Sequence, residues 1–303
     1  MKIKKRNIST YLILVIFGLY MIFPFISTGL YATSTNWSNT LLPNDFTFQW
    51  FIELFQDSNF ISAVTRSITL TLITLAVVLV VMVPTVFIVY MYFPKVDNFM
   101  KGLVLMPYAI PAVILATGLL RMYSGSAIPK YAVLVGGLFV GSLPFMYQGV
   151  RNSLEGIHSR NLMQAAEMLG ASKLQAFLKV IVPNIKLGLL ITTLLIFSGF
   201  FGEFVLTNLL IGGRYETIRI YMMRRMNENG HLASAVMVAY FLLLIVISLV
   251  ITRITSSKKG VSNSLFKRKK RKQEQVIPPL SLKQLEPAAT SEVKSNNEKR
   301  RKL

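Results

Sequence analysis

Six long apolar segments constrain the fold of this chain more than any other feature. About 20 predominantly apolar residues are needed for a helix to cross the hydrocarbon core of a bilayer. Only helices or closed barrels satisfy their backbone polar groups there. We therefore predict an all-α polytopic membrane helix bundle with six transmembrane helices. They cover approximately Tyr11–Leu30, Ser67–Tyr92, Gly102–Met122, Tyr131–Val150, Leu187–Ile211 and Leu232–Thr252.

The amino-acid composition agrees with a membrane protein and disfavours several kinds of site. Of the 303 residues, 53% are apolar and 15% are charged, whereas soluble domains carry about 25% charged residues. The chain has no cysteine, which excludes disulfides and thiolate metal sites. Its two histidines, His158 and His231, are too far apart in sequence to suggest zinc ligands. We therefore expect no metal, no cofactor and no catalytic residue, which disfavours a membrane-embedded enzyme.

The basic residues predict how the helices are oriented. With the N-terminus inside, 26 of the 33 basic residues lie in cytoplasmic segments and 7 outside, as the positive-inside rule requires. We expect a multi-pass protein of the cell (cytoplasmic) membrane with both termini cytoplasmic. Its predicted parts are an N-terminal segment (1–10), a transmembrane domain (11–252) and a tail (253–303). A signal peptide is the alternative for the first apolar segment, but the segment is long and no clear A-x-A site follows.

The tail from 253 to 303 carries 15 basic and 4 acidic residues, with six consecutive basic residues at Lys267–Lys272. Such a segment has too little apolar area to offset its ordering entropy, so we expect disorder. Its charge fits a topological anchor or attraction to anionic headgroups of the lipid bilayer. Nucleic acid is the least favoured partner, because aromatic residues are almost absent from the tail.

The predicted cytoplasmic loop Asn152–Lys186 is patterned as two short amphipathic helices separated by Gly170. Gly170 supplies a left-handed residue that ends the first helix, Ser172 and Gln175 form a capping box, and Pro183 predicts the end of the second helix. The pattern leaves open whether the pair packs against the membrane or bundle, or docks a partner. Apolar residues recur at i, i+3, i+4 and i+7: Leu162, Ala165, Ala166 and Leu169, then Leu174, Phe177, Leu178 and Ile181.

This loop carries a recognisable motif. Gln164-Ala165-Ala166, then Gly170, then Val180-Ile181-Val182-Pro183 resembles the EAA motif of binding-protein-dependent ABC importer permeases. That motif reads E-A-A, three residues, G, nine residues and I-x-L-P. The spacing matches at every step, while Gln164, Val180 and Val182 replace the glutamate, isoleucine and leucine. The resemblance covers about Tyr11 to Thr252.

The resemblance implies a role for Gln164, Ala165, Ala166, Gly170 and Pro183 in coupling to an ATPase. In this family the helix pair inserts into a cleft of an ABC ATP-binding subunit, expected here as a homodimer. Gln164 removes an ion pair there but keeps hydrogen bonding. The chain has no GxxxxGK[ST] sequence, so ATP hydrolysis is expected in that separate subunit. The resemblance also implies a second permease subunit, related or identical, and an extracytoplasmic substrate-binding protein.

Glu203 is the only acidic residue inside a predicted span. Charge at membrane depth is costly and by default indicates function. One interpretation is that Glu203 pairs with an arginine or caps backbone groups; the other is a gate or substrate contact, with Thr207 and Asn208 nearby in the pathway. The stretch around Glu203 reads Gly202-Glu203-Phe204, then Leu206-Thr207-Asn208 and a Gly-Gly loop. Within the family, it most resembles permeases of the spermidine/putrescine, 2-aminoethylphosphonate and ferric-ion group, and resembles sugar permeases less.

The predicted external loop Gly212–Gly230 departs from the positive-inside trend. Its arginines are either simply solvated or form a docking surface. The resemblance implies the second alternative, because in the family this region meets the binding protein. Arginine forms bidentate bonds to carboxylates and is favoured at interfaces. The residues concerned are Arg214, Arg219, Arg224 and Arg225.

The predicted function is that of a permease subunit of an ATP-driven ABC importer. It would form half of the pathway for a small solute of polyamine, aminophosphonate or iron type. One alternative is an importer permease for sugars or other solutes. Another is an ATPase-independent carrier or channel, but carriers typically place several ionisable groups at the membrane midplane.

Overall fold

The computed structural model describes residues 8–37, 40, 42–43 and 45–256. This part of the chain is helical apart from turns and one isolated bridge between Ser34 and Phe46. The expectations for residues 1–7 and 257–303 lie outside the described residues. The helices of the first half are α1 (Ile8–Ala32), α2 (Gln49–Gln56), α3 (Ser58–Tyr92), α4 (Pro94–Leu103), η1 (Met106–Ala109), α5 (Ala112–Tyr123) and α6 (Lys130–Gly156). Those that follow are α7 (Ser159–Met168), α8 (Lys173–Ala176), η2 (Phe177–Ile181), α9 (Val182–Phe201), α10 (Val205–Leu210), η3 (Gly212–Tyr215), α11 (Ile218–Glu228) and α12 (Gly230–Ser256).

Residue contacts divide the chain into two units, residues 1–252 and residues 253–303. The helix bundle belongs to the first unit. Its described residues include five helical runs long and apolar enough to cross a membrane: Tyr11–Ala32, Ser58–Tyr92, Lys130–Gly156, Lys173–Phe201 and Gly230–Arg253. The chain therefore has the all-α polytopic architecture that its apolar segments predict.

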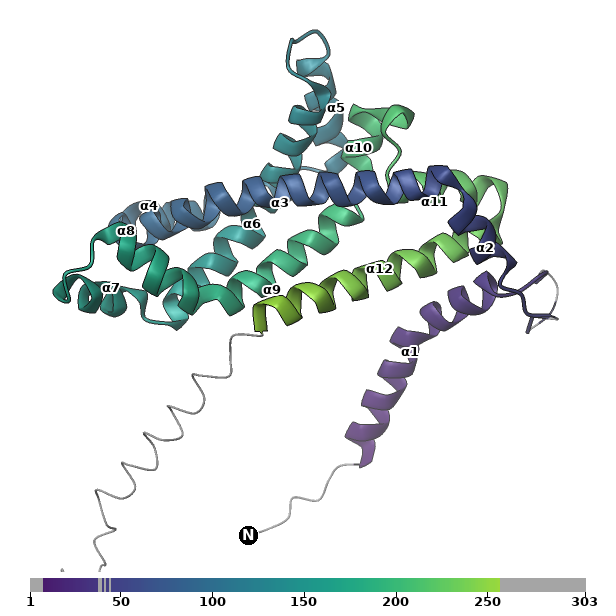
Figure 1. Cartoon of the computed structure of the whole chain (residues 1–303), viewed down its shortest axis with the longest axis horizontal. Helices are drawn as coiled ribbons and strands as arrows, with labels where there is room; N and C mark the ends of the chain where they lie inside the picture. Colours follow the sequence, from purple (N-terminus) through teal and green to yellow (C-terminus); the bar gives the residue numbers. More distant parts are fainter. Residues whose placement is uncertain (1–7, 38–39, 41, 44, 257–303) are drawn as a thin grey trace, which may run out of the picture. The chain divides into compact units, whose positions relative to one another are not determined.

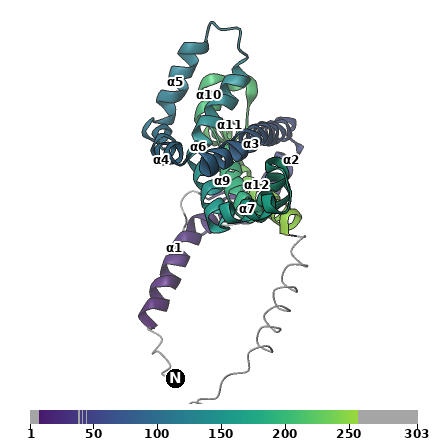
Figure 2. The same cartoon turned by 90° about the vertical axis from the view of Figure 1, so that its left-hand side faces the viewer.

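The third predicted span is broken. Pro94–Ala109 and Ala112–Tyr123 meet at an angle of 88°, so the prediction of one span over Gly102–Met122 is wrong about its straightness. Pro107 is the second residue of η1, and Pro111 precedes α5 with extended backbone (φ −56°, ψ 137°). Neither proline can donate to a helical ladder, and the extended backbone of Ile110 (ψ 116°) and Pro111 interrupts the helix between η1 and α5. In Figures 1 and 2, α5 points away from the rest of the bundle, at a steep angle to α3.

The predicted fifth span, Leu187–Ile211, differs from the structure at both ends. Its helix ends at Phe201, and the short α10 follows as a separate helix. At the other end, α8, the π-helix η2 and α9 form one run from Lys173 to Phe201, so Pro183 does not end a helix. The wide π turn lies just before Pro183, where a proline without a donor is tolerated. The side-chain amide of Asn184 donates to the Val180 carbonyl at 2.7 Å.

The centre of the bundle is formed by α3, α6 and α9, which pack against one another. Two glycines bring α6 and α9 close together. A Cβ at Gly149 would collide with the side chain of Thr192, and one at Gly188 would collide with that of Ser153. Small residues allow such close approach between membrane helices, so these positions fix the spacing of the two helices.

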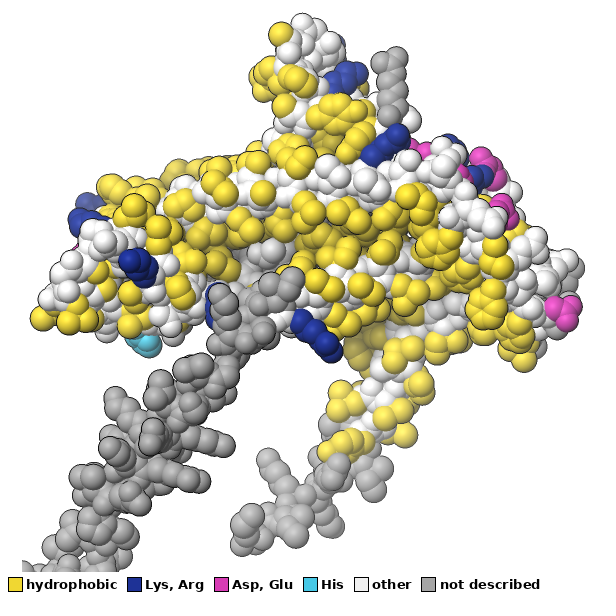
Figure 3. Space-filling model, viewed as in Figure 1, with side chains coloured by type: hydrophobic (Ala, Val, Ile, Leu, Met, Phe, Trp, Pro, Cys, Tyr) yellow, Lys and Arg dark blue, Asp and Glu magenta, His cyan; other side chains and the backbone are white. Residues whose placement is uncertain are grey.

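The first helix lies apart from this core. The most apolar stretch of α1 is wholly unburied, and Figure 1 shows α1 approaching the other helices near its C-terminal end. There the Phe25 ring lies 4.9 Å from that of Phe241, and Tyr31 stacks on His231 at 4.0 Å. In Figure 3, hydrophobic side chains cover the flank of the bundle, while acidic side chains gather at the end formed by α2 and α11. An uncharged apolar flank is the surface that lipid requires.

Candidate functional site

The loop that carries the motif forms two helical segments, α7 and the start of the α8–η2–α9 run. We call Ser159–Ile181 the helix pair. Gly170 adopts φ +85°, its N–H donates to Glu167 O at 2.9 Å, and the N–H of Ala171 donates to Ala166 O at 3.0 Å. These two bonds form a Schellman motif. Ser172 and Gln175 make the predicted capping box, so local hydrogen bonds define the turn between the two segments.

The predicted apolar faces of the helix pair are divided between inside and outside. Met163 and Ala166 of α7 are buried against the bundle, as are Ala176, Phe177 and Ile181 of the second segment. Leu162 is half-buried, and four other large apolar side chains are exposed, so the prediction of one buried apolar face on each helix is only partly met. Exposed fractions are 89% for Met168, 90% for Leu169, 67% for Leu174 and 54% for Leu178. We call these four residues the apolar corner.

The five predicted coupling residues are distributed around this turn. Gln164 and Ala165 are exposed on α7, and Ala166 is buried beneath them. Gly170 forms the turn itself, whereas Pro183 lies beyond the π turn in α9 and is exposed. Leu169, Leu174 and Leu178 belong to the predicted apolar faces, but their exposure was not predicted, because helical spacing does not say which part of an apolar face is covered.

Glu203 lies between α9 and α10 rather than inside a span. Its carboxylate accepts hydrogen bonds from the N–H of Leu206 at 2.6 Å, the N–H of Thr207 at 3.0 Å and the Thr207 hydroxyl at 2.5 Å. It therefore caps the first turn of α10, which is one of the two predicted interpretations. Thr207 is fully buried beside it, while Asn208 is half-buried on the next turn.

Glu203 also lines a cavity of about 290 Å³. The cavity is bounded by the broken span, α6, α9 and the start of α10. Thr207 and Asn208 are not among its lining residues, so of the three predicted pathway residues the structure places Glu203 there. The residues that share the cavity with it include Pro107, Tyr108, Ser142, Phe145, Gly199 and Phe200.

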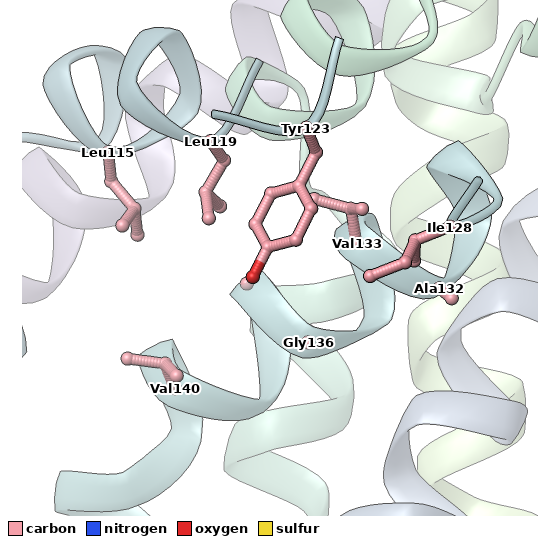
Figure 4. A pocket seen from close by; sticks show the side chains of 9 residues that line it. Leu115, Leu119, Tyr123, Ile128, Ala132, Val133, Gly136 and Val140 are labelled. Atoms are coloured by element: carbon pink, nitrogen blue, oxygen red, sulfur yellow. The ribbon is translucent and has the colours of Figure 1, made fainter. Parts of the chain in front are cut away.

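A second cavity of about 310 Å³ adjoins the first along α5 and α6. Leu115 and Gly137 line both cavities. Figure 4 shows Leu119 and Tyr123 on one side of this space and Val133 and Val140 on α6. Its wall is almost entirely apolar. The two cavities thus form an apolar groove, and the Glu203 carboxylate lies in the wall of the first cavity.

The predicted arginines at the α11 end are not equivalent. Arg225 pairs with Asp57 and also bonds Glu228 at 2.7 Å. Arg224 is more exposed and pairs with Glu216 at 3.3 Å. Arg219 is half-buried in α11, and the side chain of Arg214 lies outside the described part of the structure. Arg225 therefore holds α11 against the start of α3, whereas Arg224 remains accessible.

The Asp57 carboxylate is the centre of this contact. It caps α3 through the N–H of Asn59 at 2.8 Å and accepts the Tyr221 hydroxyl at 2.7 Å. Burial alone would raise the pKa of Asp57, but bonds from Tyr221, Asn59 and Arg225 outweigh it and lower the pKa to about 2. Burial and the bond to Asp57 raise the pKa of Tyr221 to about 12. The pair is thus a carboxylate and a neutral phenol at neutral pH.

The sequence of this chain is similar to those of known transport permease proteins. The spermidine/putrescine transport system permease protein PotB of Escherichia coli (strain K12) is 35% identical over 83 residues, which is 27% of this chain and 30% of that protein. The chain thus spans less than a third of that relative's length. PotC, the corresponding permease protein of Haemophilus influenzae, is 23% identical over 175 residues, 57% of this chain and 67% of that protein.

Two solved transporters share the fold. The MetNI methionine ABC transporter matches with a TM-score of 0.56 at 20% identity, over 68% of this chain and 97% of that chain. A bacterial ABC transporter involved in alginate import matches with a TM-score of 0.61 at 18% identity, over 84% and 98%. A family model described as the binding-protein-dependent transport system inner membrane component matches residues 86–259, more than half of the chain. This multi-pass membrane protein therefore belongs to the family of binding-protein-dependent transport system inner membrane components.

Proposed function

We propose that this chain is the permease subunit of an ATP-driven ABC importer and forms half of a pathway for a small solute. The observation that carries the proposal is the apolar corner. Four large apolar side chains, each more than half exposed, surround a turn defined by backbone hydrogen bonds. Exposed apolar patches rimmed by polar residues mark interaction sites. Met168 and Leu169 lie at the end of the polar helix α7, and Leu174 and Leu178 lie in the first turns of the Lys173–Phe201 run that follows the turn.

The occupant proposed for this corner is an ABC ATP-binding subunit, present as a homodimer. The opposite side of the helix pair is buried through Met163, Ala166, Phe177 and Ile181. A rigid pair anchored in this way can convert the closure of a docked dimer into a movement of the bundle. On this proposal the helix pair and both termini are cytoplasmic, as the distribution of basic residues favours.

Two further partners belong to the proposed complex. A second permease subunit, related or identical, would face the apolar groove along α5 and α6 and complete the pathway. An extracytoplasmic binding protein would deliver the solute at the α11 end, where Arg224 is accessible. One structure of the alginate transporter holds a pentasaccharide-bound periplasmic protein, and its shared fold supports such an arrangement here.

A cationic solute of the polyamine type fits the pathway best. Glu203 supplies a carboxylate to the cavity, and Tyr108, Phe145 and Phe200 supply aromatic rings. A cation near aromatic faces is favourable, and the carboxylate adds charge attraction. The names of the PotB and PotC relatives agree with this class.

Co-purification tests the proposal directly. The chain is expressed with its ATP-binding subunit, extracted in detergent and assayed for complex formation and ATP hydrolysis. We expect Leu169→Asp to weaken the complex about 30-fold or more, because a buried central contact costs about 2 kcal/mol or more when lost. Leu42→Asp is the matched control: Leu42 is 69% exposed but lies on the segment between α1 and α2. Transport by the chain alone, without ATP or an ATP-binding subunit, would refute the proposal and favour a carrier.

A further inference from the structure

A group of charged and aromatic side chains joins the helix pair to the end of α3. Arg160 of α7 donates from Nη2 to the Tyr90 carbonyl at 3.1 Å, and its guanidinium lies 5.3 Å from the centre of the Tyr90 ring. Nearby, the rings of Phe87 and Phe177 lie 4.4 Å apart, and Lys173 lies 5.2 Å from the Tyr92 ring. Both segments of the helix pair are thus anchored to the last two turns of α3.

The same tyrosine connects this anchor to α6. The guanidinium of Arg151, in the last turns of α6, lies 5.7 Å from the centre of the Tyr90 ring. Arg151 also donates from Nη1 to Glu155 at 2.9 Å, on the exposed side of α6. Its third contact reaches α4: Nε donates to Asp97 Oδ2 at 3.1 Å. One arginine therefore links α3, α6 and α4.

Asp97 is the buried member of this link. Its side chain is 7% exposed, and its second oxygen accepts the Tyr147 hydroxyl at 2.7 Å. Lys101 approaches from the exposed side at 3.4 Å. Moving α4 away from α6 would break the bonds that Asp97 accepts from Arg151 and Tyr147. Such a movement is costly, because it would leave buried polar groups without these partners and away from water.

The position of α4 connects the Asp97–Arg151 pair to the wall of the Glu203 cavity. α4 leads directly into η1 and the bend, and Pro107 and Tyr108 of η1 line the Glu203 cavity. α4 is therefore the arm of the broken span that precedes the bend. A continuous set of contacts runs from Arg160 on the helix pair through Tyr90 and Arg151 to Asp97, ten residues before the cavity wall.

We propose that Asp97 and Arg151 are positioning residues that tie α4 to the helix pair. When the helix pair moves, the broken span follows and the Glu203 cavity changes shape. This inference rests on the proposed function, since it needs an ATP-binding subunit to move the helix pair. Without the link, the helix pair would still move but α5 would no longer follow.

The absence of cysteine from the chain allows a direct test. Spin labels are attached in the assembled complex at two pairs of exposed positions, Glu167→Cys with Leu72→Cys, and Ile114→Cys with Leu72→Cys. The first pair reports the helix pair relative to α3, and the second reports α5. Distances are compared between the nucleotide-free complex and the complex trapped with ATP and vanadate. Thermal stability of each variant is measured in parallel.

The decisive variant carries Asp97→Asn together with Arg151→Gln. Either single substitution leaves the remaining member of the pair with only a more exposed ionic partner, Lys101 for Asp97 or Glu155 for Arg151. The double variant removes both charges of the pair and should regain most of the stability. We expect the double variant to keep the nucleotide-dependent shift of the helix pair and to lose that of α5. Glu155→Gln is the control, because it removes only the exposed partner of Arg151 and should retain both shifts.

The outcomes separate this inference from the function on which it rests. An α5 shift that persists in the stable double variant would overturn the link. Loss of both shifts together in that variant would also overturn it, because the pair would then serve only folding or assembly. If the unmodified chain binds no ATP-binding subunit, the proposed function fails, and the inference fails with it.

Discussion

The Glu203 carboxylate shows how one side chain can serve local structure and a cavity together. Its oxygens accept three hydrogen bonds from Leu206 and Thr207. A negative charge at a helix N-terminus is favourable, so capping lowers the cost of keeping this charge among membrane helices. The same residue remains part of the cavity wall. Capping and contact with a cationic solute are therefore compatible.

Glu203→Gln should slow uptake of a cationic solute such as putrescine. The amide keeps one acceptor for Leu206, but its NH₂ group faces the N–H of Thr207, so the cap of α10 weakens by about 1 kcal/mol. Uptake is measured in membrane vesicles from pH 6 to 8. Thr207→Val is the companion variant, since it removes one bond to the carboxylate and keeps the charge. Equal loss of uptake in both variants would show that capping, not charge, is what matters.

Gly170→Pro should abolish transport while membrane insertion is retained. Proline cannot reach φ +85° and cannot donate to Glu167 O, so the turn loses a bond and is strained by about 1–3 kcal/mol. Uptake and co-purification with the ATP-binding subunit are measured. Gly156→Ala is the control, because Gly156 has an ordinary helical backbone and free space around it. Normal transport by Gly170→Pro would contradict the coupling role of the turn.

At the scale of elements, α11 is held to the bundle by contacts at several points. The N–H of Ile218, the first residue of α11, donates to Ser67 Oγ at 2.9 Å, and in the preceding η3 the Tyr215 hydroxyl donates to the Arg66 carbonyl at 3.2 Å. At the other end of α11, Tyr221 and Arg225 bind Asp57. A short polar helix depends on such tertiary contacts more than on its own propensity. α11 therefore presents Arg224 from a fixed position.

Asp57→Asn should destabilise the protein by about 2 kcal/mol at neutral pH. The pKa of Asp57 in the folded protein, about 2, lies below the ordinary value of 3.8. Its stabilisation is therefore complete above about pH 5 and is lost as the pH falls towards 2. Thermal unfolding at pH 7 and near pH 3 measures this effect. The difference in stability between the unmodified protein and the variant, called the gap below, should be smaller at the lower pH. Asp45→Asn, at an exposed position, should show no such gap, and a pH-independent gap for Asp57→Asn would count against the ion pair.

For the whole molecule, the family match and the helix bundle end at nearly the same residue, although the match begins only at residue 86, within α3. The match ends at residue 259, and the last described helix, α12, ends at Ser256. The basic segment Lys267–Lys272 lies beyond both. We therefore propose that the transport cycle is carried by the bundle and that the tail adds an anchor or a lipid contact.

Truncation after Ser257 should preserve uptake per assembled complex. The amount of protein in the membrane is expected to fall, since basic charge beside the last span favours its orientation. Uptake is normalised to the amount of inserted protein that is bound to its ATP-binding subunit. Loss of normalised uptake would make the tail a working part of the transporter.

Much of the candidate site could be predicted from local chemistry. The Schellman turn at Gly170 and the capping box of Ser172 and Gln175 depend on residues at most five positions apart, and both are present. The coupling role of Gln164, Ala165, Ala166, Gly170 and Pro183 stays a prediction. The apolar corner and the Asp97–Arg151 pair were not foreseen, because each depends on which surface a distant helix covers.

The sequence by itself determined that this chain is a membrane helix bundle, because bilayer thickness translates directly into lengths of apolar sequence. It also determined the turns and caps, whose hydrogen bonds are local. Only the tertiary structure decided that the third span bends by 88° and that α9 stops at Phe201. It alone placed Glu203 in a cavity and joined Asp97 to Arg151 across 54 residues. Helical periodicity fixes the angle between faces, but contacts between distant segments decide which face is buried, which is exposed and which charge finds a partner.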